Sequence, residues 1–393
     1  MNEATTRSCC RSDISHEKHT EATGTVLQAM GRQESIARSI VRPILNAEPA
    51  KATLVRLRLL AAILTLLSLY QLPLKKIHGA LFKQLRNDDW QVSEDEYQES
   101  FRSEDKKKPE QALEATGDMG YSGSTFYSTS DKRYLVKSVP RYFEHSFFRD
   151  DFLHPYLHHM GNHPKSLLIR IFDFLAGPYM SLGHILGTAP THHIIMENIM
   201  YGKEDTTKQG GAKWENWDLK PTSYFYPERD IADGRLTSDD TKDKLADKFE
   251  DKMVLTKDQA EELIELLEED TFLLAESNAV DYSLFLVRIK AGGSSDQLSE
   301  TAPAVIPDNH PLVPPDPPSW RTGIKSPDGK HIFRAAILDF FWAKHKSQPR
   351  FMTALINMYN TLDRQGPMSI TTEPHEYRDR FLKMVKEMIE IAK

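Results

Sequence analysis

Apolar and polar residues alternate most clearly in the middle third of the chain. Two short runs rich in β-branched and aromatic residues, 125–129 and 134–139, flank the turn-forming letters SDKR, and this pattern predicts an antiparallel hairpin. Because side chains alternate between the two faces of a strand, Leu135 and Lys137 share one face. The hairpin therefore carries a lysine within an otherwise apolar strand.

Three further apolar runs, at 192–200, 284–289 and 331–341, have the length and composition of buried strands. The segment 255–273 shows instead the period of an amphipathic helix with an acidic solvated face, and Thr256 stands where it can cap the N-terminus. Together these elements predict an α+β domain.

The chain before this region falls into two parts. Residues 1–50 are polar and lack an apolar stretch next to the start, which predicts a flexible tail without a secretory signal. Within the hydrophobic segment 51–76, the uncharged stretch from Leu59 to Leu74 is shorter than the roughly 20 residues of a membrane-spanning helix. Three interpretations stay open for it: a core or oligomerisation helix, an interfacial membrane helix, and a membrane span.

A glycine-, serine- and proline-rich stretch at 291–330 separates two of the predicted strands. Its composition predicts a disordered insert. The letters PLVPPDPPSW near its end are also compatible with a polyproline ligand.

Composition limits the function classes. The 393 residues are 39% hydrophobic and 27% charged, enough for one large or two modest globular domains. A net charge of −7 argues against general nucleic-acid binding. The two cysteines, Cys9 and Cys10, are adjacent in the polar tail, so no disulfide framework is available and a reducing, cytoplasmic compartment is expected.

Candidate chemistry begins at the hairpin. Gly120 and Gly123 precede its first strand, where missing side chains let backbone N–H groups approach phosphate oxygens, and Lys137 could reach the same phosphates. No GK[ST] follows, so the pattern is that of a kinase nucleotide loop with a strand lysine and not of a Walker loop. A glycine-rich hairpin with a solvated lysine is the alternative.

Acidic residues stand at the ends of later apolar strands. Asp281 precedes the strand 284–289, Asp339 ends the strand 331–341, and Lys220 lies further upstream in WDLK. Two such carboxylates downstream of a phosphate loop and a lysine form the minimum set for metal-assisted phosphoryl transfer. The polar step after Met196 resembles a hinge whose backbone could pair with adenine.

At these segments the chain resembles the phosphatidylinositol phosphate kinases, from about residue 75 to the end. The similar segments occur in family order: GYSGSTFYSTSDKRYLVKSV, HHIIMENIM, WDLK, VDYSLFLVRI, ILDFF and ITTEPHEYRDRF. The resemblance implies a two-lobed α+β lipid-kinase fold over residues 77–393, with antiparallel sheets and packed helices. It also implies ATP- and Mg²⁺-dependent phosphorylation of an inositol-ring hydroxyl of a phosphatidylinositol phosphate at a membrane surface.

Position by position, the resemblance implies a role for each matched residue. The residues implied at the nucleotide are Gly120, Ser122, Gly123 and Ser124 over the ATP phosphates, Lys137 on those phosphates, and Met196 and Asn198 at the hinge. Lys220 would neutralise charge on the transferred group, Asp281 would orient or deprotonate the inositol hydroxyl, and Asp339 would bind Mg²⁺. Glu144 is a further candidate partner of Lys137.

The sequence also departs from the family pattern. Pro221 replaces the glycine of D-L-K-G, and Tyr121 replaces a lysine of the glycine loop. The substrate loop after Asp339 lacks the usual lysine doublet, and its candidate lipid contacts are Lys344, Lys346 and Arg350. These departures keep a catalytically weak or dead pseudokinase or scaffold, and a soluble inositol-phosphate kinase, as alternatives to an active lipid kinase.

The partners expected of the favoured enzyme are a phosphoinositide lipid and a membrane surface, with no nucleic acid, and a homodimer is a further expectation. Such an enzyme is cytoplasmic and peripheral on the membrane.

Two other patterns receive a structural interpretation. The histidines His154, His158, His159 and His163 lack a cysteine or acidic ligand to complete a metal site, and are expected to be surface residues. Apolar residues at helical spacing in 351–362 predict a packed helix in preference to a membrane-inserting one.

Overall fold

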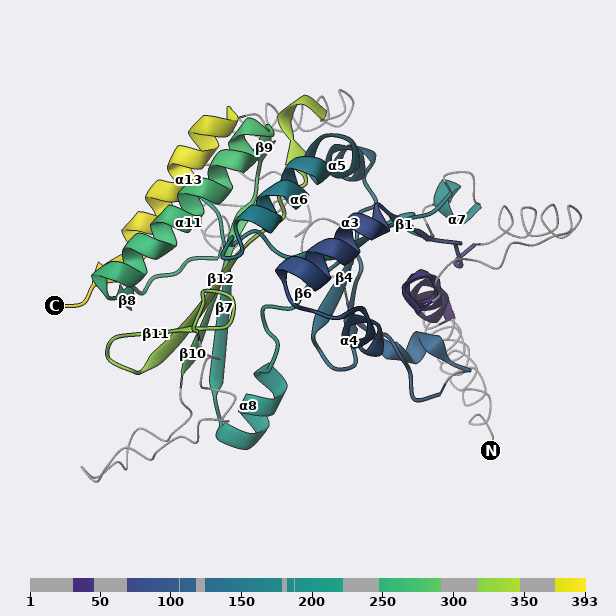
Figure 1. Cartoon of the computed structure of the whole chain (residues 1–393), viewed down its shortest axis with the longest axis horizontal. Helices are drawn as coiled ribbons and strands as arrows, with labels where there is room; N and C mark the ends of the chain where they lie inside the picture. Colours follow the sequence, from purple (N-terminus) through teal and green to yellow (C-terminus); the bar gives the residue numbers. More distant parts are fainter. Residues whose placement is uncertain are drawn as a thin grey trace, which may run out of the picture.

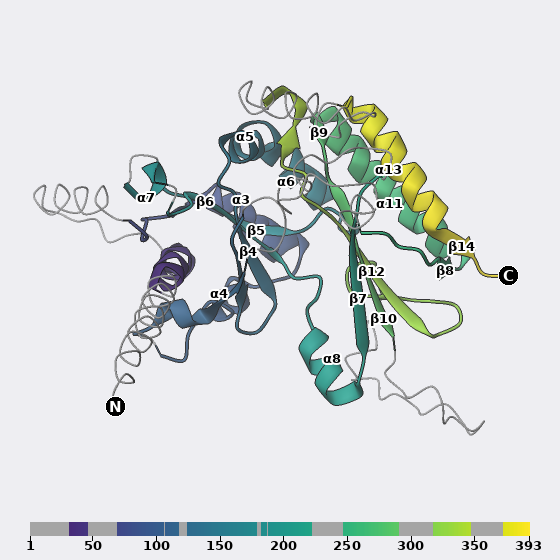
Figure 2. The ribbon, with the colours of Figure 1, turned by 180° about the vertical axis from the view of Figure 1, so that it is seen from behind.

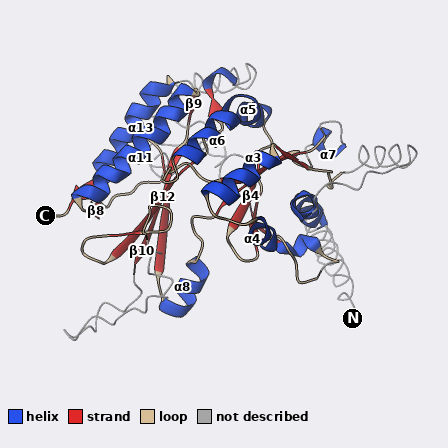
Figure 3. Cartoon of the chain, in the orientation of Figure 1, coloured by secondary structure: helices blue, strands red, loops and turns tan. Residues whose placement is uncertain are grey.

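The computed structural model describes most of the chain. The described residues are 31–45, 69–105, 107–117, 124–178, 182–186, 188–221, 247–290, 317–346 and 372–393. Figure 1 shows two sheets side by side, with the C-terminus beyond the second, and Figure 2 shows the same arrangement from behind. This two-lobed α+β arrangement confirms the predicted fold class, and Figure 3 separates its helices from its strands.

The N-terminal lobe is built on a six-stranded antiparallel sheet with the order β1-β5-β6-β4-β3-β2. Its strands are β1 Lys75–Ile77, β2 Leu113–Gly117, β3 Phe126–Thr129, β4 Tyr134–Ser138, β5 Ile171–Ala176 and β6 His192–Glu197. The predicted hairpin is confirmed, because β3 pairs with β4 in a register that sets Phe126 opposite Lys137.

The N-terminal lobe also contains short helices. They are α3 Gly79–Gln84, α4 Glu94–Glu99, α5 Tyr142–Phe147, α6 Leu153–Asn162 and α7 Leu182–Ile185, with π-helical turns at Leu85–Asp89 and Phe148–Phe152. The side chain of Ser93 caps α4 by accepting a hydrogen bond from the N–H of Glu96 at 3.2 Å. The segment between residues 79 and 99 is therefore two helices joined through a π-helical turn.

The C-terminal lobe contains a four-stranded antiparallel sheet, ordered β11-β12-β10-β7. Its strands are β7 Lys213–Leu219, β10 Ser283–Lys290, β11 Ile324–Lys325 and β12 His331–Leu338. Two smaller ladders complete the lobe: β9 Ala279–Val280 pairs with β13 Trp342–Ala343, and β8 Met253–Leu255 pairs in parallel with β14 Ile389–Ile391.

Two long helices, α11 Lys257–Glu276 and α13 Pro374–Met388, lie side by side on this lobe (Figures 1 and 2), and α8 Lys203–Gly210 lies before β7. As predicted, Thr256 caps α11, and it forms a capping box with Gln259. Leu263 and Leu267 of the same helix are buried in the core. Amphipathic spacing and a cap thus sufficed to specify this helix.

The predicted flexible tail is wrong for residues 31–45, which form a helix. Ile36, Ile40, Val41 and Ile44 are buried in the core, and their spacing of four, one and three residues places them on one helical face. The polar remainder of the segment hid this stripe.

The predicted disordered insert is also wrong at its end, for residues 317–330. Trp320 is 2% exposed, its carbonyl oxygen accepts a hydrogen bond from the N–H of Ala335 at 2.8 Å, and β11 pairs with β12. Burial of one large aromatic side chain fixes this segment. Residues 291–316 lie outside the described residues.

Other predictions concern the chain outside the described ranges: the tail before residue 31, the hydrophobic segment between 51 and 68, and the helix in 351–362. In the part of the chain that is described, no helix has both the length and the apolar character needed to cross a bilayer.

The two lobes are joined directly by backbone hydrogen bonds. The N–H of Ile337 in β12 donates to the carbonyl of Leu167 at 2.7 Å, and the N–H of Ile169 donates back to the carbonyl of Ile337 at 3.1 Å. Because residues 167–169 lead into β5 and β12 leads to Asp339, this bridge positions the N-terminal sheet relative to the end of β12.

Candidate active site

Three strands of the C-terminal sheet end at one edge. Leu219 of β7 pairs with Leu284 of β10, and Ser283 of β10 pairs with Leu338 of β12. Lys220, Asp281 and Asp339 each lie within two residues of those pairs. Sheet register therefore brings together three residues that are up to 119 positions apart in the sequence.

Both aspartates have an unusual backbone. Asp281 has φ 65° and Asp339 has φ 60°, the left-handed region, which few residues other than glycine adopt and in which aspartate is among the tolerated ones. Each stands where the chain leaves one ladder for another: Asp281 between β9 and β10, and Asp339 between β12 and β13. Such conformations concentrate at functional sites.

The first ion pair of the site joins Lys220 and Asp281. Their Nζ and Oδ2 atoms are 2.9 Å apart, and the two side chains are 8% and 12% exposed. In such a partly desolvated position the attraction between opposite charges is stronger than at the surface. The pair holds the lysine ammonium next to the carboxylate.

The second ion pair crosses between the lobes. The ammonium of Lys137, on β4, contacts Oδ1 of Asp339. The nitrogen lies 5.6 Å from the ring centre of Phe126 and 6.0 Å from that of Phe341, while the Asp339 side chain is 44% exposed. A buried cation and an accessible carboxylate thus face each other, which leaves the carboxylate open to a ligand from solvent.

The glycine loop enters the sheet beside Lys137. The N–H of Thr125 donates to the hydroxyl of Ser138 at 2.8 Å, and the two hydroxyls are 3.1 Å apart. Ser124 is buried, whereas Gly120, Tyr121, Ser122 and Gly123 lie outside the described residues. The loop's C-terminal end is therefore anchored one residue from the lysine, and the phosphate-contacting role of its glycines stays a prediction.

The predicted hinge residues lie at the end of β6, on the Lys137 face. Met196 pairs with Leu135 of β4 and with Ile171 of β5, so its backbone is inside the sheet and its side chain shares the face of Lys137. The N–H of Asn198 donates to Arg133 at 2.9 Å. Met196 therefore presents its side chain, and not its backbone, on the Lys137 face, and its contact with a nucleotide stays a prediction.

The carboxylate that contacts Lys137 is that of Asp339 and not the one expected from the helix. Glu144, on α5, lies 3.5 Å from Arg141, one turn earlier in the chain. Glu144 as the partner of Lys137 is thus wrong in this structure.

On the substrate side, Lys344 contacts Glu373, the residue that precedes α13. Lys346 ends the short 3₁₀ turn that Lys344 begins, and Arg350 lies outside the described residues. Between the two lysines, His345 lies 3.2 Å from Asp151. These contacts tie the start of the substrate loop to both lobes and leave its lipid contacts as a prediction.

One histidine of the cluster is buried in the core. His159 is buried, and its Nε2 lies 2.6 Å from Asp270, which also accepts hydrogen bonds from Ser166 and from the N–H of Leu167. The expectation that all four histidines lie at the surface is therefore wrong for His159. Among the described residues, no group of three histidine, cysteine or acidic side chains is arranged to hold a metal ion.

Two arginines form hydrogen bonds around the hinge, and neither of them was identified by the sequence analysis. Arg321 contacts Glu197 and donates to the carbonyls of Ser166 and Leu168. On β12, Arg334 donates to the carbonyls of Ile199 and Tyr201, just after β6. Nothing in the letters WRTG or IFRA distinguishes these arginines from surface ones.

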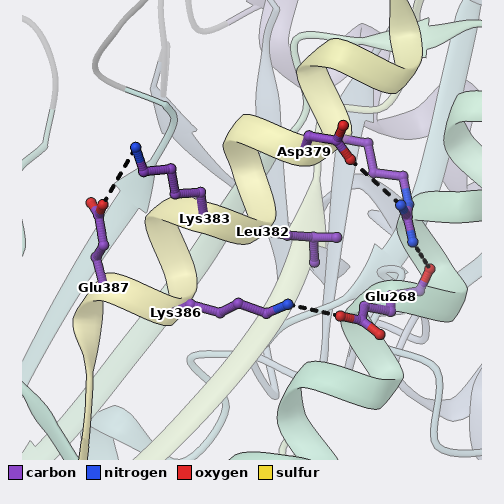
Figure 4. Close-up of a pocket in the computed structure, with 7 residues that line it drawn as sticks. Glu268, Asp379, Leu382, Lys383, Lys386 and Glu387 are labelled. Carbon is purple, nitrogen blue, oxygen red and sulfur yellow. Dashed lines mark hydrogen bonds and ion pairs between the residues drawn. The ribbon is translucent and has the colours of Figure 1, made fainter.

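A groove between α11 and α13 is a separate feature (Figure 4). Lys386 pairs with Glu268 at 2.9 Å, Lys383 with Glu387 at 3.9 Å, and Arg378 with Asp379 at 3.7 Å. The charges that line it are therefore paired with one another, and we assign it no chemistry.

Comparison with known proteins agrees with this geometry. The family described as Phosphatidylinositol-4-phosphate 5-Kinase matches residues 107–388, more than half of the chain. This chain belongs to that family. The matched range contains both lysines and both aspartates of the site.

A probable phosphatidylinositol phosphate kinase of Dictyostelium discoideum is 28% identical to the chain over 180 residues. The match covers 46% of this chain and 23% of the amoebal protein. The chain thus corresponds to about a quarter of that relative's length.

Proposed function

We propose that this chain is a lipid kinase that transfers the γ-phosphoryl group of ATP to an inositol-ring hydroxyl of a phosphatidylinositol phosphate. The observation that carries the proposal is the pairing of Lys137 with Asp339 and of Lys220 with Asp281 at one edge of a sheet. Phosphoryl transfer requires mainly positioning and stabilisation of charge. The two lysines and two aspartates, which come from both lobes, supply this positioning and this stabilisation of charge.

Each residue has a separate role in this proposal. Lys137 holds the ATP phosphates, and Lys220 stabilises the negative charge on the transferred group. Asp281 accepts a hydrogen bond from the attacking hydroxyl and takes its proton as the new P–O bond forms. The bond between the γ-phosphorus and the β–γ bridging oxygen of ATP breaks in the same transfer, and ADP leaves. The ion pair with Lys220 holds the Asp281 carboxylate in position before substrate arrives.

Asp339 fits the role of a magnesium ligand. Its carboxylate is accessible, and Mg²⁺ prefers one or two carboxylates together with substrate phosphates. When bound, the ion would neutralise charge on the phosphates. Because Lys137 also prefers those phosphates, ATP binding is expected to draw the lysine away from Asp339 and release the carboxylate oxygens.

The membrane part of the proposal rests on the substrate. A phosphoinositide presents its headgroup at the bilayer surface, so we propose that the protein acts as a peripheral enzyme on the cytoplasmic face. Lys344, Lys346 and Arg350 are the proposed contacts to the lipid phosphate.

A scaffold that keeps the fold without activity is the second candidate. It is favoured by Pro221 directly after Lys220, and by the hinge backbone, since Met196 lies inside the sheet and the N–H of Asn198 is already bonded to Arg133.

The test is the transfer of labelled γ-phosphate from ATP and Mg²⁺ to liposomes that each contain one phosphoinositide, alongside the matching water-soluble headgroups. Labelling of one lipid supports the proposal and identifies the substrate. Labelling of the soluble headgroup alone assigns a soluble inositol-phosphate kinase. Absence of labelling on a protein that still binds ATP, or that binds none, assigns the scaffold.

A further inference from the structure

A cavity of about 120 Å³ lies next to the hinge. Its wall comes from the loop before β5, from the first half of α11 and from the segment before β11, the part of the predicted insert that proved to be ordered. The lining residues are Pro164, Lys165, Arg170, Glu262, Leu266, Ser319, Trp320 and Arg321.

Three of these residues carry buried N–H groups without a hydrogen-bond partner among the described residues. They are Nε of Arg170, Nε of Arg321 and Nε1 of Trp320. Buried donors in folded proteins are almost always satisfied by protein, water or ligand. Since all three groups can only donate, their partner must supply acceptors.

The charge of the wall is positive. The Arg170 guanidinium donates to the carbonyl of Pro164 at 3.4 Å, lies 5.1 Å from the Trp90 ring centre, and forms no ion pair within the described chain. The backbone N–H of Arg170 donates to Oε1 of Glu197 at 2.9 Å. Burial, together with the positive charge of Arg321, outweighs the nearby negative charge of Glu197 and lowers the pKa of Arg170 to about 10. Its positive charge is therefore incompletely compensated.

Each of the other two cations that line the cavity forms an ion pair with a carboxylate. Arg321 contacts Glu197, outside the lining, and Lys165 lies 2.6 Å from Glu262 in the more exposed part of the wall. Of the four charged lining residues, three are positive and Glu262 alone is negative.

We propose that this cavity binds a phosphate group. A tetrahedral oxyanion is an acceptor on every side and matches a wall of arginine and indole donors. The cavity has room for about four waters at ~30 Å³ each, which also accommodates one oxyanion of five heavy atoms. Arg321 also forms an ion pair with Glu197 at the end of β6. A phosphate bound in the cavity would therefore contact Arg321, the residue that holds the hinge in position.

The test is isothermal titration of the full-length protein with inorganic phosphate, with chloride at equal ionic strength as reference. Arg170→Gln removes a charged donor and is expected to weaken binding by about ten- to a hundredfold. Trp320→Phe removes only the indole N–H and is expected to weaken it about three- to tenfold. Arg102→Gln, at an exposed arginine of the same lobe as Arg170, is the matched control and should bind like the wild type.

A second control separates this cavity from the proposed nucleotide site. Lys137→Met should retain the phosphate binding that Arg170→Gln loses, and no phosphoryl transfer is involved in the measurement. The opposite result assigns the phosphate to Lys137 and overturns the proposal. Binding no stronger than that of chloride, or equal in Arg170→Gln and wild type, overturns it too and leaves a cavity that holds only water.

The same titration distinguishes two sources of the phosphate. Vesicles that contain a phosphatidylinositol phosphate are compared with vesicles that lack it. Binding of those vesicles that depends on Arg170 identifies a lipid headgroup, while Arg170-dependent binding of inorganic phosphate alone identifies a free phosphate; either supports the site.

Discussion

Arg334 is expected to be a main determinant of stability at the junction of the lobes. Its Nη1 donates to the carbonyls of Ile199 at 3.0 Å and Tyr201 at 2.8 Å, and its Nε donates to the carbonyl of Thr322 at 3.1 Å. The guanidinium lies 4.9 Å from the ring centre of Trp214. One side chain on β12 thus joins the hinge to the segment before β11, and Arg334→Met removes all these bonds.

The expected loss of stability is the free energy of the lost hydrogen bonds less the desolvation cost of the buried guanidinium. Three hydrogen bonds from a charged donor are worth roughly 1.5–3 kcal/mol each. Against this, burial lowers the pKa of Arg334 from 12.5 to about 10, which corresponds to roughly 3 kcal/mol of unfavourable desolvation. Tyr201 is exposed, so water can replace one of the lost bonds. We expect Arg334→Met to lower the free energy of unfolding by roughly 1–3 kcal/mol.

Equilibrium unfolding in urea measures this difference, with Arg102→Met as the matched control. Arg102 is half exposed and, in the described part of the chain, its side chain pairs with Glu99 alone, three residues away. Its loss should therefore change stability by less than about 0.5 kcal/mol. If Arg334→Met is no more destabilising than this control, the reasoning about the hinge is refuted.

Three further predictions concern separate parts of the molecule. Lys220→Met should lower the rate of phosphoryl transfer by about 10²–10³-fold with little change in the apparent affinity for ATP, as steady-state kinetics can show. Thr256→Ala should destabilise the protein by about 0.5–2 kcal/mol in urea unfolding, because it removes the capping box of α11. Burial disfavours the charge of Glu215, but hydrogen bonds from two lysines and an arginine outweigh it and lower its pKa to about 2. Because the unfolded chain binds this proton more tightly, Glu215 contributes roughly 1–3 kcal/mol to the free energy of unfolding above pH 5, and this contribution is lost as the pH falls towards 2. The stabilities of Glu215→Gln and wild type should therefore differ most near neutral pH and converge near pH 2.

Local pattern was enough to predict the elements whose side chains alternate or recur along the chain. The hairpin that carries Lys137 and the helix that begins after Thr256 are both observed. In each case the signal lies within about 20 consecutive residues: period-two alternation around a turn, or an apolar stripe behind a cap.

The apolar stripe of 31–45 was overlooked because polar residues dominate its surroundings. The stripe buries Ile40 and Val41 completely. Composition averaged over the first 50 residues predicted a tail, whereas burial depends on one face of a helix.

The pairing within the site could not be read from the sequence. Lys220 and Asp281 meet because β7 and β10 are neighbours in a particular register, and Lys137 reaches Asp339 because the lobes are bridged at Leu167 and Ile337. Such contacts depend on strand order and on the relative position of the lobes, which local letters do not encode.

We propose that Lys137, Lys220, Asp281 and Asp339 form one phosphoryl-transfer site. The most direct test of this proposal is the rate of labelled γ-phosphate transfer to the preferred phosphoinositide by Asp281→Asn, compared with Asp379→Asn, which neutralises an exposed aspartate on α13. Asparagine tolerates the left-handed backbone that Asp281 adopts, so the fold should survive. We expect a loss of about 10²–10⁴-fold for Asp281→Asn and none for the control. A folded Asp281→Asn protein that retains the wild-type rate would contradict the assignment.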